Sequence, residues 1–507
     1  MNWPRSCSFA ISLLLTARLV AAQQPQEKSS AGMSPIATLQ HRVEQLSAAV
    51  SQEESALESS LSQIRQLRNQ VSELQTELAA ATGTPHAAPE LDHGQQEIAS
   101  FHAEVDKLRE QADLEQSEIA VHEQAKVETQ SKFPFKLTGL ILMNTFANTN
   151  GVDVAQSPTL TTGGSRATGL SLRQTVLGLD ARGPHLFGAT SAADLRIDFF
   201  GGSGQSNSGA GYADGGGFVR LRTAHAELDW NHTRTFFEMD RPIVNPNSPT
   251  SLTAVAQPAL AWSGNLWNWL PQVGAEQSVA LGGSSRLKME AAVADIPDPA
   301  YAGSGLSALP GTSLAESSRW PGSEARIAYA RGDEASGPDV GIGGYFSPHS
   351  SGGIRFDAWA ATIDFRIPFS SRFEASGSAY RGAGLGGLGG GAFKDYAYRL
   401  RGEYSYFRPL DDVGGWTQLK ARAGQRLEFN TAYGLDNLFA GQLRPYLPLN
   451  PNAYQSLARN ATIFSNAIFS PTASTLFSFE FRRIDSSPAL GQHLTANIFG
   501  AAAGYRF

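Results

Sequence analysis

The residues with the clearest chemical potential in this chain are charged side chains that occur at every second position. In one segment, Asp194, Arg196 and Asp198 alternate with apolar side chains, and residues 395–407 and 417–429 show the same alternation. Side chains at every second position of a β-strand share one face, so each such strand would have one charged and one apolar face. We expect the charged faces to line a water-filled interior.

The residues expected to line that interior are mostly arginines and acids. They are Asp194, Arg196, Asp198, Arg220, Arg222, His225, Glu227, Arg399, Arg401, Glu403, Lys420, Arg422 and Arg426. Arg220 and Arg222 differ in parity from Glu227, so either a β-bulge separates them or one set does not face the interior. Arginine binds carboxylate and phosphate groups through two parallel hydrogen bonds, which favours anionic solutes, although the neighbouring acids would neutralise part of this charge.

A long connection at residues 241–272 differs from the glycine- and serine-rich connections, because prolines stiffen it and it carries three tryptophans. We expect it to fold into the interior and to form a constriction; the alternative is an outer surface loop that packs against its neighbours. The residues expected to contribute to the constriction are Arg241, Asn245, Asn247, Trp262, Asn265, Trp267 and Trp269.

The last stretch of the chain, residues 494–507, predicts a closing barrel strand. Phe499, Tyr505 and Phe507 would share one face with two alanines, whereas glycines and an arginine would occupy the other. The last strand of a bacterial outer-membrane barrel commonly has such rings at the lipid interface. We expect it to pair with residues 137–147, because a sheet edge left free in lipid would have unsatisfied backbone groups. The alternative is a strand of a soluble β-sandwich.

About sixteen segments, to within two, alternate between apolar and polar side chains. They predict an all-β, antiparallel transmembrane barrel over residues 133–507. An even number of strands returns both ends of the barrel to the same side. The expected strands include 394–407 and 416–430, joined by a short connection at 408–415. Short and long connections alternate along the chain, and a barrel of this size encloses water rather than a packed core.

The part of the chain before the barrel predicts export followed by helices. Residues 1–22 resemble a signal peptide, and residues 23–35 a short disordered lead. Apolar residues in heptad spacing predict a coiled coil at 36–81, a Pro/His linker follows at 82–94, and a weaker heptad pattern indicates a second helical segment at 95–132. We expect this coil to lie in the periplasm and the barrel in the outer membrane.

Composition excludes several functions. No apolar run approaches the roughly 20 residues that a membrane-spanning helix needs. The only cysteine, Cys7, lies in the predicted signal peptide, so thiol catalysis is excluded from the mature chain. The acidic excess lies before the barrel, and the barrel itself is nearly neutral, which argues against nucleic acid as a partner. Histidine spacing fits no metal site, and we expect no cofactor.

Two other functions are consistent with the pattern. A hydrolase built on a barrel could use His225 with Glu227, but the sequence has no Gly-x-Ser-x-Gly motif, so we expect no enzymatic activity. Alternatively, the coil could tether the cell wall or a partner, with the barrel as its anchor.

The order of heptad segment, linker and barrel resembles the DcaP-like trimeric outer-membrane porins. Local similarity covers about residues 170–280, in Leu172–Arg182, Leu195–Gly201 and Val219–Leu228. The resemblance implies a periplasmic coiled coil, a sixteen-stranded barrel, a homotrimer and passage of dicarboxylates and similar small anions. Apart from small solutes and membrane lipid, the expected partner is the barrel assembly machinery, through the strand that ends at Phe507. β-branched residues in the coil instead favour dimers.

Overall fold

The computed structural model describes residues 135–201, 218–299, 312–333, 337–351, 353–401 and 404–507. The predicted signal peptide, the lead, both helical segments and the linker, which fall within residues 1–132, lie outside these ranges and stay predictions. Within the described part of the chain, no helix combines the length and the apolarity needed to cross a membrane.

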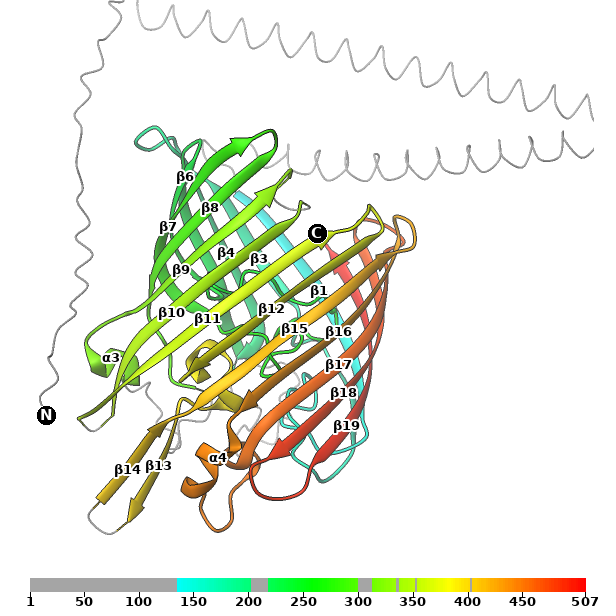
Figure 1. Cartoon of the computed structure of the whole chain (residues 1–507). Helices are drawn as coiled ribbons and strands as arrows, with labels where there is room; N and C mark the ends of the chain where they lie inside the picture. Colours follow the sequence, from blue (N-terminus) through cyan, green and yellow to red (C-terminus); the bar gives the residue numbers. More distant parts are fainter. Residues whose placement is uncertain (1–134, 202–217, 300–311, 334–336, 352, 402–403) are drawn as a thin grey trace, which may run out of the picture. The chain divides into compact units, whose positions relative to one another are not determined.

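Most of the described residues belong to one antiparallel sheet that closes on itself (Figure 1). Its strands are β1 (Phe135–Asn148), β2 (Ala167–Ser171), β3 (Val176–Arg182), β4 (Thr190–Gly201), β5 (Phe218–Asp229), β6 (Thr233–Asp240), β7 (Leu270–Gly282), β8 (Ser285–Ala294), β9 (Gly322–Arg331), β10 (Asp339–Ser351), β11 (Ile354–Pro368), β12 (Phe373–Ala383), β15 (Asp411–Arg422), β16 (Leu427–Leu438), β17 (Leu457–Phe469), β18 (Thr475–Pro488) and β19 (Leu494–Arg506).

These seventeen strands make a sixteen-stranded wall. Strands β2 and β3 pair with successive halves of β1, so together they form one wall strand that is interrupted between Ser171 and Val176. Strand β1 also pairs with β19, from Leu140 opposite Arg506 to Asn148 opposite Ile498, which closes the barrel as expected. The predicted fold class is therefore confirmed for the barrel.

The wall is apolar outside and polar inside. In β18, Phe477, Phe479 and Phe481 are 46%, 58% and 37% exposed, whereas Glu480 and Arg482 between them are buried. Strand β19 follows the same rule, with its aromatic side chains exposed and its alanines and glycines of the other parity buried. A soluble barrel would have the opposite polarity, so this arrangement suits a wall that is surrounded by lipid and encloses water.

Two of the expected wall strands are wrong, although the number sixteen is right. Residues 394–407 fall largely in β13 (Tyr396–Arg401) and β14 (Tyr404–Pro409), which pair only with each other and form a separate hairpin. Residues 416–430 belong to two wall strands, β15 and β16, separated by a turn at 423–426. The first error adds a strand and the second removes one. The expected short connection at 408–415 mostly belongs to β14 and β15.

Both errors have a physical reason. Because the turn has four residues, even-numbered positions face the interior both before and after it. Glu428 in β16 therefore continues the alternation of the inward-facing Lys420 and Arg422 in β15, and the turn leaves no mark in the pattern. The hairpin alternates because one of its faces packs on the barrel: Tyr396 stacks on Phe407 at 4.3 Å between ring centroids, and both rings contact an aromatic side chain of β11. Period-two alternation thus marks strands without showing which sheet they join.

The connections alternate between short turns at one end of the barrel and mostly longer segments at the other, as the sequence predicts (Figure 1). Apart from the hairpin of β13 and β14, the regular elements of the longer described segments are short helices. These are α3 (Leu314–Ser318), η1 (Gly386–Leu388), η2 (Gly391–Phe393), α4 (Ala440–Leu443), η3 (Arg444–Tyr446) and α5 (Ala453–Ser456).

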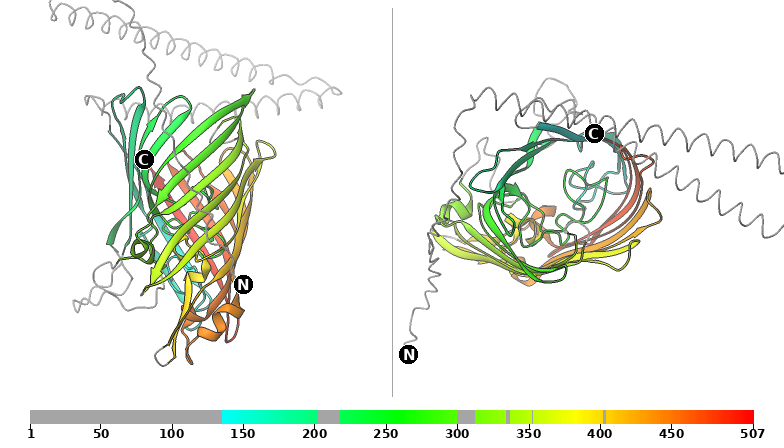
Figure 2. Two further views of the ribbon diagram at one scale, coloured as in Figure 1. Left: turned by 60° about the vertical axis from the view of Figure 1, so that its left-hand side comes forward. Right: turned by 90° about the horizontal axis from the view of Figure 1, so that it is seen from above.

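The connection between β6 and β7, residues 241–269, lies inside the barrel, and we call it the inner loop. Seen along the barrel, chain segments fill part of the ring of strands (Figure 2). Wall side chains hold the backbone of the inner loop from several sides: Asn144 of β1 donates to the Leu252 carbonyl at 2.7 Å, and Asn466 of β17 donates to the Thr250 carbonyl at 2.9 Å. The inner loop therefore folds inward, and its role as a constriction stays a prediction.

A second interior segment, residues 384–394, packs against the inner loop. The ring of Phe393 stacks on Trp262 at 4.0 Å between centroids, and Trp267 meets Trp262 edge to face at 5.9 Å. A side chain at Gly389 would lie 2.7 Å from the Trp267 ring, so a residue without Cβ allows this close approach. The two segments share a hydrophobic core inside the barrel.

Candidate functional site in the lumen

Charged side chains remain accessible inside the barrel on the wall formed by β4, β5 and β6. The side chains of Asp194, Arg196 and His225 are 32%, 29% and 23% exposed. On β18, which three wall strands separate from β4, Glu480 and Arg482 are almost fully buried, and Ser251 of the inner loop donates to the Glu480 carboxylate at 2.5 Å. The inner loop thus covers one side of the interior and leaves the β4–β6 side open.

A β-bulge brings the charged residues of β5 to the same face. Arg196 of β4 lies opposite Thr223, and the next residue of β4 lies opposite Leu221, so Arg222 is the additional residue. The bulge reverses the parity of the strand after Arg222. Arg220 and Arg222 before the reversal and His225 after it therefore all face the interior, which resolves the conflict in the sequence pattern.

Arg220 and Arg222 join the wall to the inner loop. Arg220 binds the fully buried Asp198 through two hydrogen bonds, Nε to Oδ1 at 2.8 Å and Nη2 to Oδ2 at 3.0 Å. Arg222 donates to the Val255 carbonyl of the inner loop at 2.5 Å. Both guanidinium groups also lie 5.0 Å from the ring centroid of Trp269, within the range of a cation–π contact.

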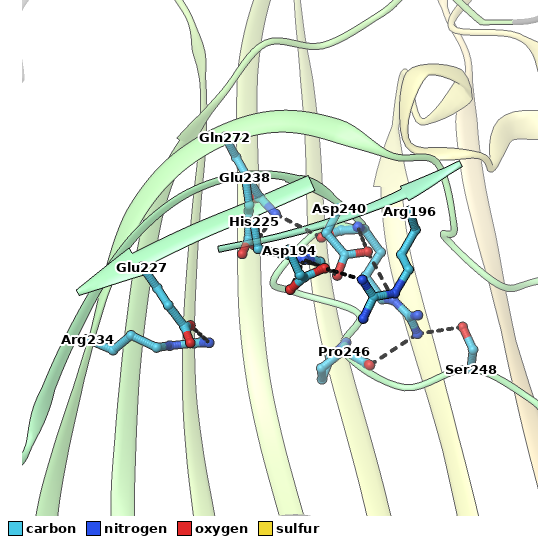
Figure 3. Close-up of polar contacts among 11 residues, drawn as sticks. Asp194, Arg196, His225, Glu227, Arg234, Glu238, Asp240, Pro246, Ser248 and Gln272 are labelled. Carbon is cyan, nitrogen blue, oxygen red and sulfur yellow. Dashed lines mark hydrogen bonds and ion pairs between the residues drawn. The ribbon is translucent and has the colours of Figure 1, made fainter. Parts of the chain in front are cut away.

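His225 bridges two carboxylates across neighbouring strands (Figure 3). Its Nδ1 lies 3.0 Å and 3.1 Å from the carboxylate oxygens of Asp194, and its Nε2 lies 3.1 Å from Oδ2 of Asp240. Arg196 binds Asp180 of β3 at 2.5 Å and approaches Asp194 at 3.5 Å. These residues form a polar network on the open wall.

Glu238 and Arg241 complete this network. Gln272 of β7 donates to Glu238 at 2.9 Å and to the Arg241 carbonyl at 3.0 Å. The Arg241 guanidinium donates to Ser248 at 2.7 Å and lies 3.8 Å from Asp240. We refer to Asp194, Arg196, His225, Glu238, Asp240 and Arg241 together as the lumen cluster.

A second network extends from Glu227 away from the lumen cluster. Arg234 binds Glu227 at 3.3 Å and Glu276 at 3.2 Å, and further along the sheet Arg326 contacts Glu290 at 2.7 Å as well as Asp339 and Asp364. The Arg326 side chain is 2% exposed. The enclosed pairs of Arg326 fix the relative position of strands and are costly to break, so we assign them to the structure of the wall, whereas Arg234 and Glu227 are 37% and 33% exposed.

The remaining expected lining residues are in different environments. Lys420 and Arg422 face the interior and pair with acids: Lys420 with Glu428 at 3.7 Å, and Arg422 with Glu374 at 3.3 Å. Arg426 is half-buried in the turn at 423–426.

Arg399 and Arg401 belong to the separate hairpin, so their assignment to the wall is wrong. Arg399 donates to the Pro445 carbonyl at 2.8 Å. Glu403 lies outside the described residues. The sequence pattern assigns Arg399 and Arg401 to the wall because period-two alternation does not distinguish a hairpin in a connection from a wall strand.

The expected constriction residues divide into two groups. Trp262, Trp267 and the two asparagines Asn245 and Asn265 are buried in the interior segments, where Asn245 donates to Asn265 at 2.8 Å. They therefore hold the inner loop in shape. Arg241 and Trp269 instead lie beside the charged wall, and Asn247 is half-buried.

Sequence reasoning missed Asp180, Glu238 and Asp240. The signal for the latter two was present, because Arg234, Glu238 and Asp240 share one parity in a short strand. Within the described ranges, no group of three or more potential ligands has a geometry that would hold a metal ion.

A closed antiparallel barrel of sixteen strands with a loop folded into its interior defines the porin fold. One solved structure with this fold is the outer membrane channel DcaP of Acinetobacter baumannii. The similarity has a TM-score of 0.57 and 17% sequence identity, and it covers 75% of this chain and 99% of the DcaP chain. The predicted resemblance to DcaP-like barrels is thus confirmed for the fold.

An anion-selective porin from Comamonas acidovorans is a more distant match, with a TM-score of 0.47, 10% identity and coverage of 74% of this chain and 100% of its own. No protein-family model and no curated protein sequence matches the chain.

Proposed function

We propose that the barrel is an outer-membrane porin through which small hydrophilic solutes diffuse, with a preference for small anions such as carboxylates. The observation that carries the proposal is the open β4–β6 wall, where charged side chains stay accessible inside a barrel whose outer face is apolar. The fold of a protein described as an outer membrane channel supports the same function. A passive channel requires no catalytic residue, so the proposed function is not enzymatic.

The preference for anions is supported by the charges next to the inner loop. Arg220 and Arg222 share one carboxylate, Asp198, which is fully buried, whereas both guanidinium groups remain partly accessible. Arg241 adds a third guanidinium nearby. Guanidinium groups bind carboxylates with two hydrogen bonds, so a solute with a carboxylate would gain an interaction here that a cation would not.

The proposed surroundings of the barrel follow from the sequence. An even number of strands returns both chain ends to one side, so the segment before the barrel would lie in the periplasm with the short turns. The resemblance to DcaP-like porins supports a homotrimer. Deletion of residues 36–130 should leave conductance unchanged if the predicted coil is an accessory, and a loss of conductance would instead make the coil part of the channel.

The test of the proposed function is conductance of the purified protein in planar bilayers. We expect open channels and, under a potassium chloride gradient, a reversal potential that indicates higher permeability for chloride. Absence of conductance would contradict the porin function. Conductance with higher permeability for potassium would retain the porin and overturn the preference for anions.

A further inference from the structure

The contacts of His225 in the lumen require a protonated ring. A neutral imidazole has one nitrogen that donates a hydrogen bond and one that accepts, whereas an ionised carboxylate only accepts. Both ring nitrogens of His225 lie within 3.1 Å of a carboxylate oxygen, one on Asp194 and the other on Asp240. Only the imidazolium can donate to both, and loss of its proton would turn a lone pair towards one carboxylate.

No other cation in the lumen cluster can replace the positive charge of that proton. From β4, Asp194 and Arg196 face the ring, and Arg196 is shared with Asp180 of β3. Strand β6 contributes Asp240 and Glu238, the inner loop contributes Arg241, and β7 contributes the neutral Gln272. On β5 itself, Arg222 precedes the ring and Glu227, paired with Arg234, follows it.

Within the lumen cluster, three carboxylates therefore oppose two guanidinium groups. Loss of the His225 proton therefore makes the net charge of this region more negative by one unit. These side chains are partly accessible, so the difference acts on solutes in the lumen.

We propose that His225 is a selectivity-determining residue, whose protonation sets the balance between anion and cation permeation. This inference rests on the proposed porin function. As the imidazolium, His225 neutralises the lumen cluster and allows anions to approach the arginines; as the neutral ring, it leaves a negative wall that repels anions and attracts cations. One charge at about 5 Å, screened by salt, changes the local concentration of an ion roughly twofold.

The test is the reversal potential of the full-length protein in planar bilayers between about pH 5 and about pH 10, a range that includes the titration of a histidine. For the unchanged protein, we expect the ratio of chloride to potassium permeability to fall roughly fourfold as the pH rises, because the local chloride concentration falls about twofold and that of potassium rises about twofold. His225→Gln should abolish this step and keep the lower ratio throughout. His225→Lys should also abolish it but keep the higher ratio, because lysine stays charged over most of this range.

The matched control is His493→Gln, since His493 lies in an exposed loop and should retain the full pH step. A step that persists at its full size in His225→Gln, or a ratio in the unchanged protein that does not depend on pH, would overturn the inference while leaving the porin function intact. Cation preference at every pH, with a step that His225→Gln removes, would support the role of His225 and contradict only the preference for anions. Absence of conductance in the unchanged protein would overturn both proposals.

Discussion

Replacing Arg220 and replacing its partner Asp198 should have unequal costs, because the two side chains differ in burial. Asp198 is fully buried and accepts hydrogen bonds from Arg220 at 2.8 Å and 3.0 Å, whereas the Arg220 side chain is 27% exposed. In Arg220→Met, the stem can still pack on the aromatic rings, but the buried carboxylate loses its bidentate partner.

The expected magnitude for Arg220→Met follows from what Asp198 retains. Removing one partner of a buried ion pair costs roughly 3–5 kcal/mol. Asp198 keeps the hydrogen bond from the Phe200 amide at 2.9 Å and a contact with Arg222 at 3.7 Å, so we expect the lower end, about 3 kcal/mol. Asp198→Asn leaves guanidinium groups that water can reach, and its cost should be about 1 kcal/mol.

The assay is equilibrium unfolding of the barrel by urea in lipid vesicles, compared among the two single variants and the double variant. The double variant should cost less than the sum of the singles by at least about 1 kcal/mol, because Arg220→Met no longer leaves a buried charge once Asp198 is neutral. Equal costs for the two single variants, or strict additivity, would refute the enclosed position of Asp198 and the lumen geometry built on it.

Three further outcomes are expected. Trp262→Ala removes a buried ring that stacks on Phe393, so it should lower the free energy of unfolding by roughly 3–5 kcal/mol and make single-channel currents noisier. Steady currents would contradict the packing of the inner loop. Burial raises the pKa of Asp395 to about 7 from its ordinary 3.8, so the folded state binds this proton more tightly than the unfolded state. Thermal stability should therefore fall as the pH rises from about 4 to about 7. Asp395→Asn should flatten this dependence, and an unchanged slope would count against the enclosure of residues 384–394. Deleting Phe507 removes two backbone hydrogen bonds with β1 at the seam, so it should lower the yield of assembled barrel without changing the selectivity of the channels that form, and altered ion preference in normally assembled barrels would argue otherwise.

The wall of the barrel was predictable from sequence because its signal is local. Each strand shows its own inside and outside, and the seam between β1 and β19 followed from the exposed rings of the last strand. The same locality limited the boundaries. The turn at 423–426 preserves parity and is invisible to a period-two pattern, and the hairpin of β13 and β14 alternates like a wall strand.

The lumen cluster was only half predictable. Asp194, Arg196 and His225 were expected in the interior on parity alone, but the pairing of His225 with Asp194 and Asp240 depends on three strands and a bulge at Arg222. The roles of the tryptophans also differed from expectation, since Trp262 and Trp267 pack within the interior segments. Such contacts depend on where a long connection folds, which no local spacing determines.

We infer that solutes pass along the β4–β6 wall, while the inner loop and residues 384–394 fill other parts of the interior. The most direct test uses one cysteine at a time, treated with a negatively charged thiosulfonate reagent during bilayer recording. Arg196→Cys places the thiol on the open wall, and Ser378→Cys places it on β12, where the native side chain is 2% exposed. We expect the reagent to reduce the current through Arg196→Cys channels and to leave the current through Ser378→Cys channels unchanged. A reduced current through Ser378→Cys channels, with an unchanged current through Arg196→Cys channels, would contradict a solute path along the β4–β6 wall.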